Sequence, residues 1–146
     1  MLSKFLFFLL FFVSVSGYGQ AAVSLTDSLV ADFHAAWNAN DLHEMLTRLQ
    51  EDAFFKSPHQ LRVGRAELAK TVLKSNPPMI RDCRNLEYYS HVEGDIAWSV
   101  GRLFCNSYDE SGNLTMKGEE KTTEYTYVFT RNPKGVWKIQ MLLYHE

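Results

Sequence analysis

The stretch from Ala35 to Pro58, AAWNANDLHEMLTRLQEDAFFKSP, decides how this chain folds. It contains the end of one predicted helix, a second helix and a short strand. Asn40 can end the first helix, because asparagine tolerates the backbone conformations found at helix C-termini. Asp41 and Glu44 have the spacing of a capping box, which predicts the start of the second helix. The strand is predicted over residues 52–57 and ends before the proline.

The first helix is predicted to begin upstream, at a capping box formed by Ser24 and Asp27. Apolar residues then recur every fourth position and form one helix stripe: Leu25, Leu29, Phe33 and Trp37. His34 lies one residue beyond this stripe, which predicts a residue at the boundary of the buried face. A position facing a cavity is the alternative. A third helix is predicted over 65–75, and Asn76-Pro77-Pro78 ends it.

The second half of the chain changes to a period of two, which is typical of β-strands. The predicted strands cover 83–92, 96–108, 114–117, 122–131 and 136–145. A bulge or break is predicted over 118–121. Helices followed by an antiparallel meander indicate an α+β fold, in which three N-terminal helices pack on the concave face of a curved antiparallel sheet.

The first residues have the layout of a secretory signal peptide. Lys4 is followed by the apolar run Phe5–Val13 and by small residues that include Gly17 and Gly19. This run is shorter than the roughly 20 residues that a membrane-spanning helix needs. We expect residues 1–19 to be removed, leaving one domain over 20–146 that is secreted or periplasmic and not attached to the membrane. A retained anchor is the alternative.

Composition excludes several classes of function. The formal net charge is −2, so there is no basic excess and nucleic acid is not an expected partner. The five histidines show no HxH or HExxH spacing and there is no CxxC, so neither a metal nor a cofactor is expected. No GxSxG elbow is present. Aromatic residues make up 14% of the chain, which is enough for some of them to line a cavity.

The two cysteines, Cys83 and Cys105, are predicted to face each other across a β-hairpin. If the turn covers 93–95 and Val92 faces Ile96, residues whose numbers add to 188 are opposite, as 83 and 105 are. A disulfide is permitted in an exported protein. Because a register slip of one residue breaks this alignment, two separate thiols remain the alternative.

The order of these elements resembles the nuclear transport factor 2-like superfamily, which includes ketosteroid isomerase-like and SnoaL-like branches. The matching residues are Ala36–Leu42, Glu51–Phe54, Gly64-Arg65, Gly94–Trp98 with Gly101, Tyr125–Phe129 and Gly135–Ile139. The resemblance implies a cone-shaped domain and a homodimer formed through the sheets. It does not specify an activity, because this scaffold hosts many unrelated functions.

The ketosteroid isomerase branch provides a test of function. Its chemistry needs a carboxylate base before the proline that ends the first strand, a tyrosine on the first helix and an acid on a later strand. Ser57 and Phe33 stand at the first two positions here, and Tyr127 falls near the third. A serine hydroxyl does not serve as a base near neutral pH, so steroid isomerisation is not expected.

Strand alternation and the geometry of the family predict which side chains point inward. The expected inward residues are Ile96, Trp98, Val100, Arg102, Tyr125, Tyr127, Phe129, Gln140, Leu142 and Tyr144. The opposite parity, which buries Thr126, Val128, Ile139, Met141 and Leu143, stays open. With the first parity, the ligand-binding residues are Phe33, Trp37, Phe55, Ser57, Trp98, Arg102, Tyr127, Gln140 and Tyr144. Arg102 would pair with a ligand carboxylate or, alternatively, with Glu120 or Glu124.

The leading interpretation is an exported domain that binds an unknown small, partly apolar molecule, with no specific reaction evident from the sequence. The rival is a cofactor-independent SnoaL-like cyclase, dehydratase or isomerase that uses Asp52, His34 or Tyr127 in acid–base roles. Asp52 is alternatively a turn cap. A third interpretation is a protein-interaction module whose cavity is filled by its own side chains, which an apolar outer sheet face would favour.

Overall fold

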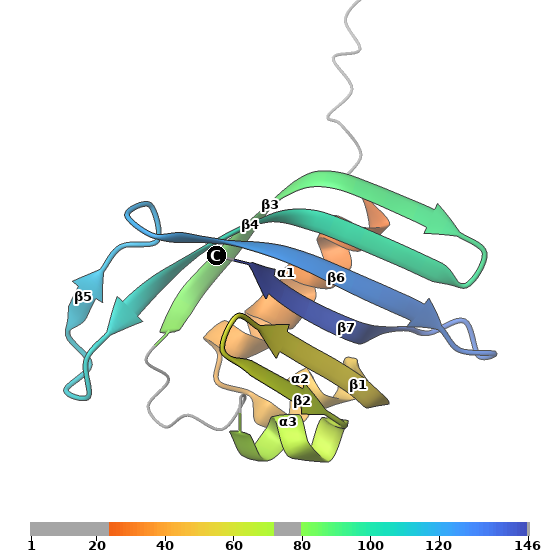
Figure 1. Cartoon of the computed structure of the whole chain (residues 1–146), viewed down its shortest axis with the longest axis horizontal. Coiled ribbons are helices and arrows are strands. Elements are labelled where there is room, and N and C mark those ends of the chain that lie inside the picture. Colours follow the sequence, from red (N-terminus) through yellow and green to blue (C-terminus); the bar gives the residue numbers. More distant parts are fainter. Residues whose placement is uncertain (1–23, 72–79, 146) are drawn as a thin grey trace, which may run out of the picture.

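The computed structural model describes residues 24–71 and 80–145, as helices packed against one sheet (Figure 1). The helices are α1 (Leu25–Asn38), α2 (Leu42–Thr47) and α3 (Arg65–Thr71). The strands are β1 (Leu49–Ser57), β2 (Gln60–Val63), β3 (Ile80–Glu93), β4 (Ile96–Tyr108), β5 (Leu114–Met116), β6 (Thr122–Arg131) and β7 (Trp137–His145). The predicted signal peptide and the predicted stop at Asn76-Pro77-Pro78 lie outside the described residues. None of the described helices is long and apolar enough to cross a membrane.

The sheet has the order β2-β1-β7-β6-β4-β3, and β5 pairs with β4. It curves over α1, which confirms the predicted α+β layout (Figure 1). The sheet is mixed rather than wholly antiparallel, because β1 runs parallel to β7. No short turn joins these two strands, so hairpin geometry does not set their relative direction. β2, where no strand was predicted, pairs antiparallel with β1 at the edge of the sheet.

Helix α1 begins at the predicted cap, where the Ser24 hydroxyl accepts a hydrogen bond from the backbone N–H of Asp27. Its buried face differs from the predicted stripe. Leu25 is 43% exposed, whereas Val30 and His34 are buried together with Phe33. The boundary position predicted for His34 is therefore wrong, because His34 is buried in the packed interior.

The prediction of which side chains point inward is right for β6 and wrong for β4. Tyr125, Tyr127 and Phe129 are fully or almost fully buried. Their partners across the β4–β6 pair are small: Gly101, Ser99 and Ala97. Large inward residues on one strand therefore leave room only for small ones on the next. The residues of β4 that were expected inside face the other way: Ile96, Trp98, Val100 and Arg102.

A bulge in β7 changes which of its side chains point inward. Phe129 pairs with Ile139 and Val128 pairs with Met141, so Gln140 is the extra residue. Ile139 is buried on the same side as Leu142, and Tyr144 also points inward. The expected inward position of Gln140 is wrong, because the bulge turns it toward β1.

Cys83 and Cys105, for which the sequence left a disulfide and two separate thiols open, form a disulfide with their Cα atoms 4.1 Å apart. The route to this register differs from the prediction. Glu93 pairs with Ile96, so the turn has two residues instead of three. A bulge at Tyr88 then restores the alignment before the strands reach the cysteines.

Candidate functional site

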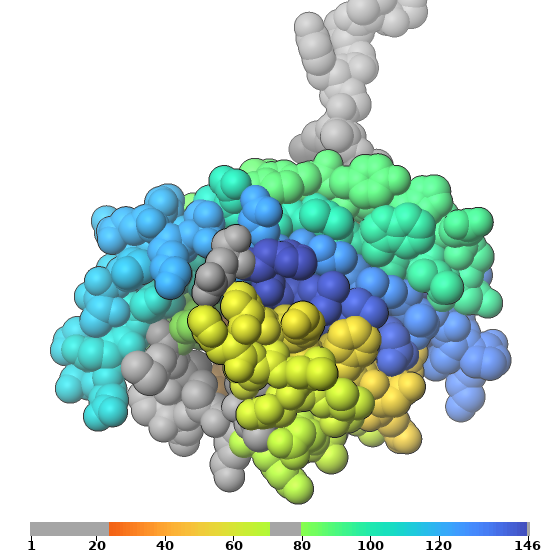
Figure 2. Space-filling view, viewed as in Figure 1, coloured from red at the N-terminus to blue at the C-terminus, as the bar shows by residue number. Residues whose placement is uncertain are grey.

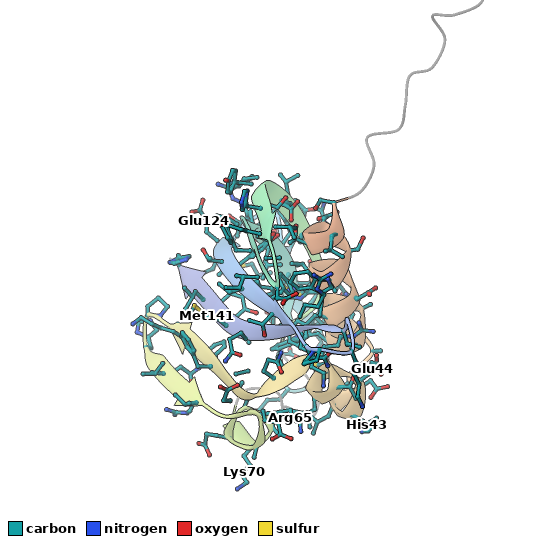
Figure 3. All side chains as sticks on the ribbon, turned by 90° about the vertical axis from the view of Figure 1, so that its right-hand side faces the viewer. His43, Glu44, Arg65, Lys70, Glu124 and Met141 are labelled. Carbon is teal, nitrogen blue, oxygen red and sulfur yellow. A yellow bond between two sulfur atoms is a disulfide. The ribbon has the colours of Figure 1, made fainter. Side chains whose placement is uncertain are left out.

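The interior between α1 and the sheet holds an aromatic cluster, which we define as Phe33, His34, Tyr127 and Tyr144. Side chains of both layers fill this space (Figure 3). The Phe33 ring meets the Tyr127 ring edge-on at 6.2 Å, and Tyr127 meets Tyr144 in the same way at 5.8 Å. Edge-to-face contacts of this kind are favourable beyond the area they bury. Phe55 packs against Tyr144 at 5.3 Å and extends the cluster to β1.

His34 is the polar member of the cluster that comes from the helix. It is 3% exposed, and its Nε2 atom lies 3.0 Å from the Tyr127 hydroxyl. Burial lowers the pKa of His34 from its usual 6.5 to about 4, because the charged imidazolium would lose its hydration. The imidazole is therefore neutral at physiological pH. Its Nδ1 atom is buried and has no hydrogen-bond partner among residues 24–71 and 80–145.

Two tyrosine hydroxyls continue the chain of hydrogen bonds from His34. Tyr127 bonds to His34 on one side and to the Tyr144 hydroxyl on the other. Burial raises the pKa of both tyrosines above the usual value, so both stay protonated at neutral pH. The result is a continuous polar path, His34–Tyr127–Tyr144, within an apolar interior.

This path ends beside a pocket of about 250 Å³. The pocket lies where the parallel strands β1 and β7 both end, and Figure 2 shows the β1–β2 hairpin next to the end of β7 on the surface. Its lining residues are Lys56, Ser57, Pro58, Leu143, Tyr144 and His145. Tyr144 therefore belongs both to the buried hydrogen-bond path and to the pocket wall.

Five of the predicted ligand-binding residues lie in or beside this site. They are Phe33, Phe55, Ser57, Tyr127 and Tyr144. Trp37 borders the cluster through Phe33, at 6.3 Å between ring centroids. Its indole N–H donates to the Ile80 carbonyl, which fixes the ring against the start of β3.

Three other predicted binding residues lie elsewhere. Trp98 packs against His91, with ring centroids 4.7 Å apart and tilted planes, on the outer face, which is the sheet face turned away from α1. Arg102 lies on the same face and pairs with Glu124 at 3.3 Å, the alternative that the sequence left open. Glu124 and Met141 are seen on this side of the sheet in Figure 3.

Gln140 is the third of these residues. Its side-chain amide lies 3.1 Å from an Asp52 carboxylate oxygen. Asp52 is exposed in the middle of β1, so it neither faces the cluster nor caps a turn.

The Glu87 carboxylate, which was not among the predicted site residues, lies at the N-terminal end of α1. Glu87 accepts hydrogen bonds from the hydroxyls of Ser24, Thr26 and Ser99. Burial raises the pKa of Glu87, but these hydroxyls outweigh that effect and the net pKa lies below the usual value. Strand alternation from Cys83 places Glu87 on the inward face, and this is the signal that could have found it.

Metal binding has no structural support within the described ranges. No group of three or more His, Cys, Asp or Glu side chains there is arranged to hold an ion. The chemistry of the site therefore consists of hydroxyls, one neutral imidazole and the basic side chains at the pocket rim.

Comparison with known proteins identifies the fold. No family model matches the sequence, and no curated protein matches it. A ketosteroid isomerase-like protein from Erwinia carotovora atroseptica superposes with a TM-score of 0.70 at 14% identity, covering 86% of this chain and 96% of that one. A protein from Novosphingobium aromaticivorans described as nuclear transport factor 2-like with a cystatin-like fold gives 0.63 at 16% identity, covering 82% and 78%. The chain has the nuclear transport factor 2-like fold.

A third similar structure shows how little this fold says about function. A domain of unknown function from Nostoc punctiforme gives a TM-score of 0.65 at 18% identity, covering 82% of this chain and 74% of that one. Proteins with this nuclear transport factor 2-like fold thus have different functional descriptions, and the site must carry the functional argument. The aromatic cluster of this chain is compatible with ligand binding.

Proposed function

We propose that this protein is an exported domain that binds a small, partly apolar molecule at the pocket beside the aromatic cluster. One observation carries the proposal. Tyr144 lines the pocket and its hydroxyl is held by the buried hydrogen-bond path, so a ligand in the pocket would meet a fixed aromatic side chain next to apolar walls. Mostly apolar walls with a few fixed polar groups are the usual composition of small-molecule sites.

The test is a fragment screen followed by ¹⁵N NMR. Binding at this site is expected to shift the amide signals of residues 56–58 and 143–145 and to leave those around Trp98 on the outer face unchanged. The variant Tyr144→Ala should lose binding, whereas Trp98→Ala should keep it. A screen in which no fragment shifts the pocket signals would overturn the proposal. Export is checked separately, by sequencing the N-terminus of the exported protein, which we expect to begin at Gln20.

His34 favours a second candidate function. The His34 imidazole is uncharged at neutral pH because burial lowers its pKa to about 4, and its hydrogen bond to the Tyr127 hydroxyl supplies the pair of groups that this candidate would use in acid–base roles. Perturbed titratable groups of this kind cluster at active sites. The corresponding activity would be that of a cofactor-independent cyclase, dehydratase or isomerase of the SnoaL-like type. Turnover of any fragment that binds, lost in His34→Gln and kept in His43→Gln, would support this candidate over simple binding.

The outer face favours an interaction role in addition to ligand binding. It carries exposed apolar residues on β3 and β4: Leu86, Tyr89 and Ile96, at 52%, 56% and 49% exposure. The Arg102–Glu124 pair on this face offers both charges, as a self-complementary two-fold interface requires. We propose a second copy of the chain as the partner, giving a homodimer. Light scattering should show a dimer that Leu86→Lys converts to a monomer, while Leu25→Lys on α1 keeps it dimeric.

A further inference from the structure

Helix α1 lies against the sheet (Figure 1), and two groups of contacts with different chemistry hold it there. The first group is at its N-terminal end. The hydroxyls of Ser24, the cap residue, and Thr26 donate to the Glu87 carboxylate on β3. The Asn85 amide, also on β3, donates to the Asp27 carboxylate on α1. Both acceptors are carboxylates, and hydrogen bonds to a charged group are roughly twice as strong as neutral ones, so acid weakens this end of the contact.

Hydroxyl groups from α1, β4 and β6 surround Glu87. Besides Ser24 and Thr26 on α1, Ser99 donates from β4, and the Tyr125 hydroxyl on β6 lies 3.3 Å from the Ser99 hydroxyl. A proton on Glu87 would remove the charge that these donors bind, and it would occupy one of the acceptor positions of the carboxyl group. The contact between Glu87 and the start of α1 therefore depends on the ionised carboxylate.

His34 is the acid-sensitive contact further along the helix. Its neutral ring is hydrogen-bonded to the Tyr127 hydroxyl on β6, and its Nδ1 atom has no partner among the described residues. The titratable groups that face it from the sheet are Tyr127 and, beyond it, Tyr144 on β7, and both stay uncharged because burial raises their pKa. A proton on His34 would therefore place a charge in the interior with no carboxylate bonded to it in this part of the structure, which is costly.

The second group of contacts is at the C-terminal end of α1 and involves no side chain that titrates in acid. The Trp37 indole N–H donates to the Ile80 carbonyl at 2.9 Å. The Asn38 side chain donates to the Cys83 carbonyl at 2.9 Å and accepts from the Cys83 backbone N–H at 2.7 Å. The disulfide to Cys105 in turn fixes Cys83 to β4. These contacts keep their strength at low pH, so this end of the helix stays attached.

The sheet is held together mainly by groups that do not titrate. Backbone hydrogen bonds join its strands, and the disulfide also joins β3 to β4. Asp32 on α1 pairs with Arg48 at 3.3 Å, but this partly exposed pair joins α1 to the end of α2 and contributes little. Protonation of His34 and Glu87 therefore weakens the contact between α1 and the sheet more than it weakens the sheet itself.

We propose that residues 24–34 form an acid-released flap, which detaches from the sheet as the pH falls and turns about a hinge at Trp37 and Asn38 while the sheet stays folded. The opening uncovers the members of the aromatic cluster that the sheet contributes. The burial of Val30 and Phe33 opposes it, so the open state is a minor population at neutral pH. Release of the flap needs no ligand and is independent of the proposed binding function.

Amide hydrogen exchange of the wild type at pH 7 and pH 4, corrected for the intrinsic exchange rate at each pH, tests the flap. An isolated helix this short is marginal in water, so its amides exchange once it has detached. The pKa of His34 is about 4 in the closed protein and returns to about 6.5 when the ring is exposed, so acid should raise the opening equilibrium of residues 28–34 about a hundredfold. At pH 4 this equilibrium should lie at least about tenfold above that of the amides in β4 and β6, which exchange through global unfolding.

Two results would overturn the flap. Equal opening equilibria at pH 4 for residues 28–34 and for the amides of β4 and β6 would mean that the protein unfolds as one unit. Protection of residues 28–34 that does not change between pH 7 and pH 4 would mean that acid does not release the helix.

Matched variants identify the groups that hold and release the flap. Glu87→Gln should raise the opening equilibrium of residues 28–34 at pH 7 about tenfold or more, whereas Glu93→Gln, an exposed change at the end of β3, should leave it nearly unchanged. Asn38→Ala removes an acid-insensitive contact, so it should lower protection equally at both pH values and keep the ratio between them. His34→Gln should reduce that ratio to about tenfold or less. A ratio reduced more by Asn38→Ala than by His34→Gln would contradict the roles of hinge and acid-sensitive contact.

Discussion

The Nε2 atom of His34 lies 3.0 Å from the Tyr127 hydroxyl, joining α1 to β6 through the interior of the protein. The two rings are nearly parallel, with an angle of 16° between their planes. No charged partner contributes to the lowered pKa of His34; its cause is burial. This arrangement makes the stability of the fold sensitive to acid.

We expect His34 to destabilise the fold as the pH falls. Its pKa is about 4 in the folded protein and about 6.5 in the unfolded chain, so below pH 6.5 the unfolded state binds the proton first. The free energy of unfolding should therefore decrease between pH 6.5 and 4, by about 3 kcal/mol from this residue at about 1.4 kcal/mol per pKa unit. Urea unfolding of the wild type and of His34→Gln at pH 7 and pH 4 measures the difference.

The control for this prediction is His43→Gln. His43 is exposed on α2, so this variant should lose as much stability between pH 7 and pH 4 as the wild type does. His34→Gln should be less stable than the wild type at pH 7 but lose less on acidification. An equal loss in all three proteins would contradict the role assigned to His34.

Glu87→Gln is expected to lower the free energy of unfolding at pH 7. Three hydroxyl groups donate to the Glu87 carboxylate, and hydrogen bonds to a charged group each contribute about 1.5–3 kcal/mol. Because the amide can still accept one of them, we expect a net loss of about 2 kcal/mol in urea unfolding. Glu93→Gln, an exposed change at the end of β3, should cost little.

The effect of Glu87 also has a defined pH dependence. The pKa of its carboxyl is lower in the folded protein than the usual 4.5, so the stabilisation is present above that pH and is lost as the pH falls below it. The difference in the free energy of unfolding between the wild type and Glu87→Gln should therefore decrease below about pH 4.5. A gap of constant size at all pH values would show that the charge of Glu87 does not act on stability.

Gly101→Ala tests the packing of large against small residues across β4 and β6. An added Cβ atom would lie 2.3 Å from the Leu86 carbonyl oxygen and 2.7 Å from the Tyr125 hydroxyl. Because backbone blocks one side, we expect a loss of about 3 kcal/mol or more in thermal unfolding. In Gly112→Ala the added Cβ atom would meet no atom within 4 Å, so the only cost is that of the positive φ of +82°, about 1–2 kcal/mol. Equal losses in the two variants would contradict the tight packing.

The sequence predicted the parts of the fold that depend on local signals. Ser24 and Asp41 cap the helices where the capping pattern placed them, and β4 and β6 have the predicted bounds. Capping and strand alternation are set by neighbouring residues, so they can be read without knowledge of distant contacts.

The candidate site was predicted less completely, because it depends on which face of each strand is covered. Trp98 was expected inside because the geometry of the family decided between the two possible parities of β4, but Ser99 is the residue that pairs with the buried Tyr127. This is a non-local constraint that alternation alone cannot supply. The bulge at Gln140 had the same effect on β7. His34 was misplaced because a polar residue does not mark an apolar stripe, although its hydrogen bond to Tyr127 makes burial feasible.

The disulfide between Cys83 and Cys105 is expected to stabilise the β3–β4 hairpin against unfolding. The two residues are 22 positions apart, and closing a loop of that length stabilises the fold by about 3 kcal/mol through the lost freedom of the unfolded chain. The double variant Cys83→Ala/Cys105→Ala avoids leaving a single thiol and should show this loss in urea unfolding. Thiol labelling of the unfolded, unreduced protein should find no free cysteine. Two reactive thiols per chain would show that the two cysteines lie opposite each other without a bond, and a double variant as stable as the wild type would show that the bond does not stabilise the fold.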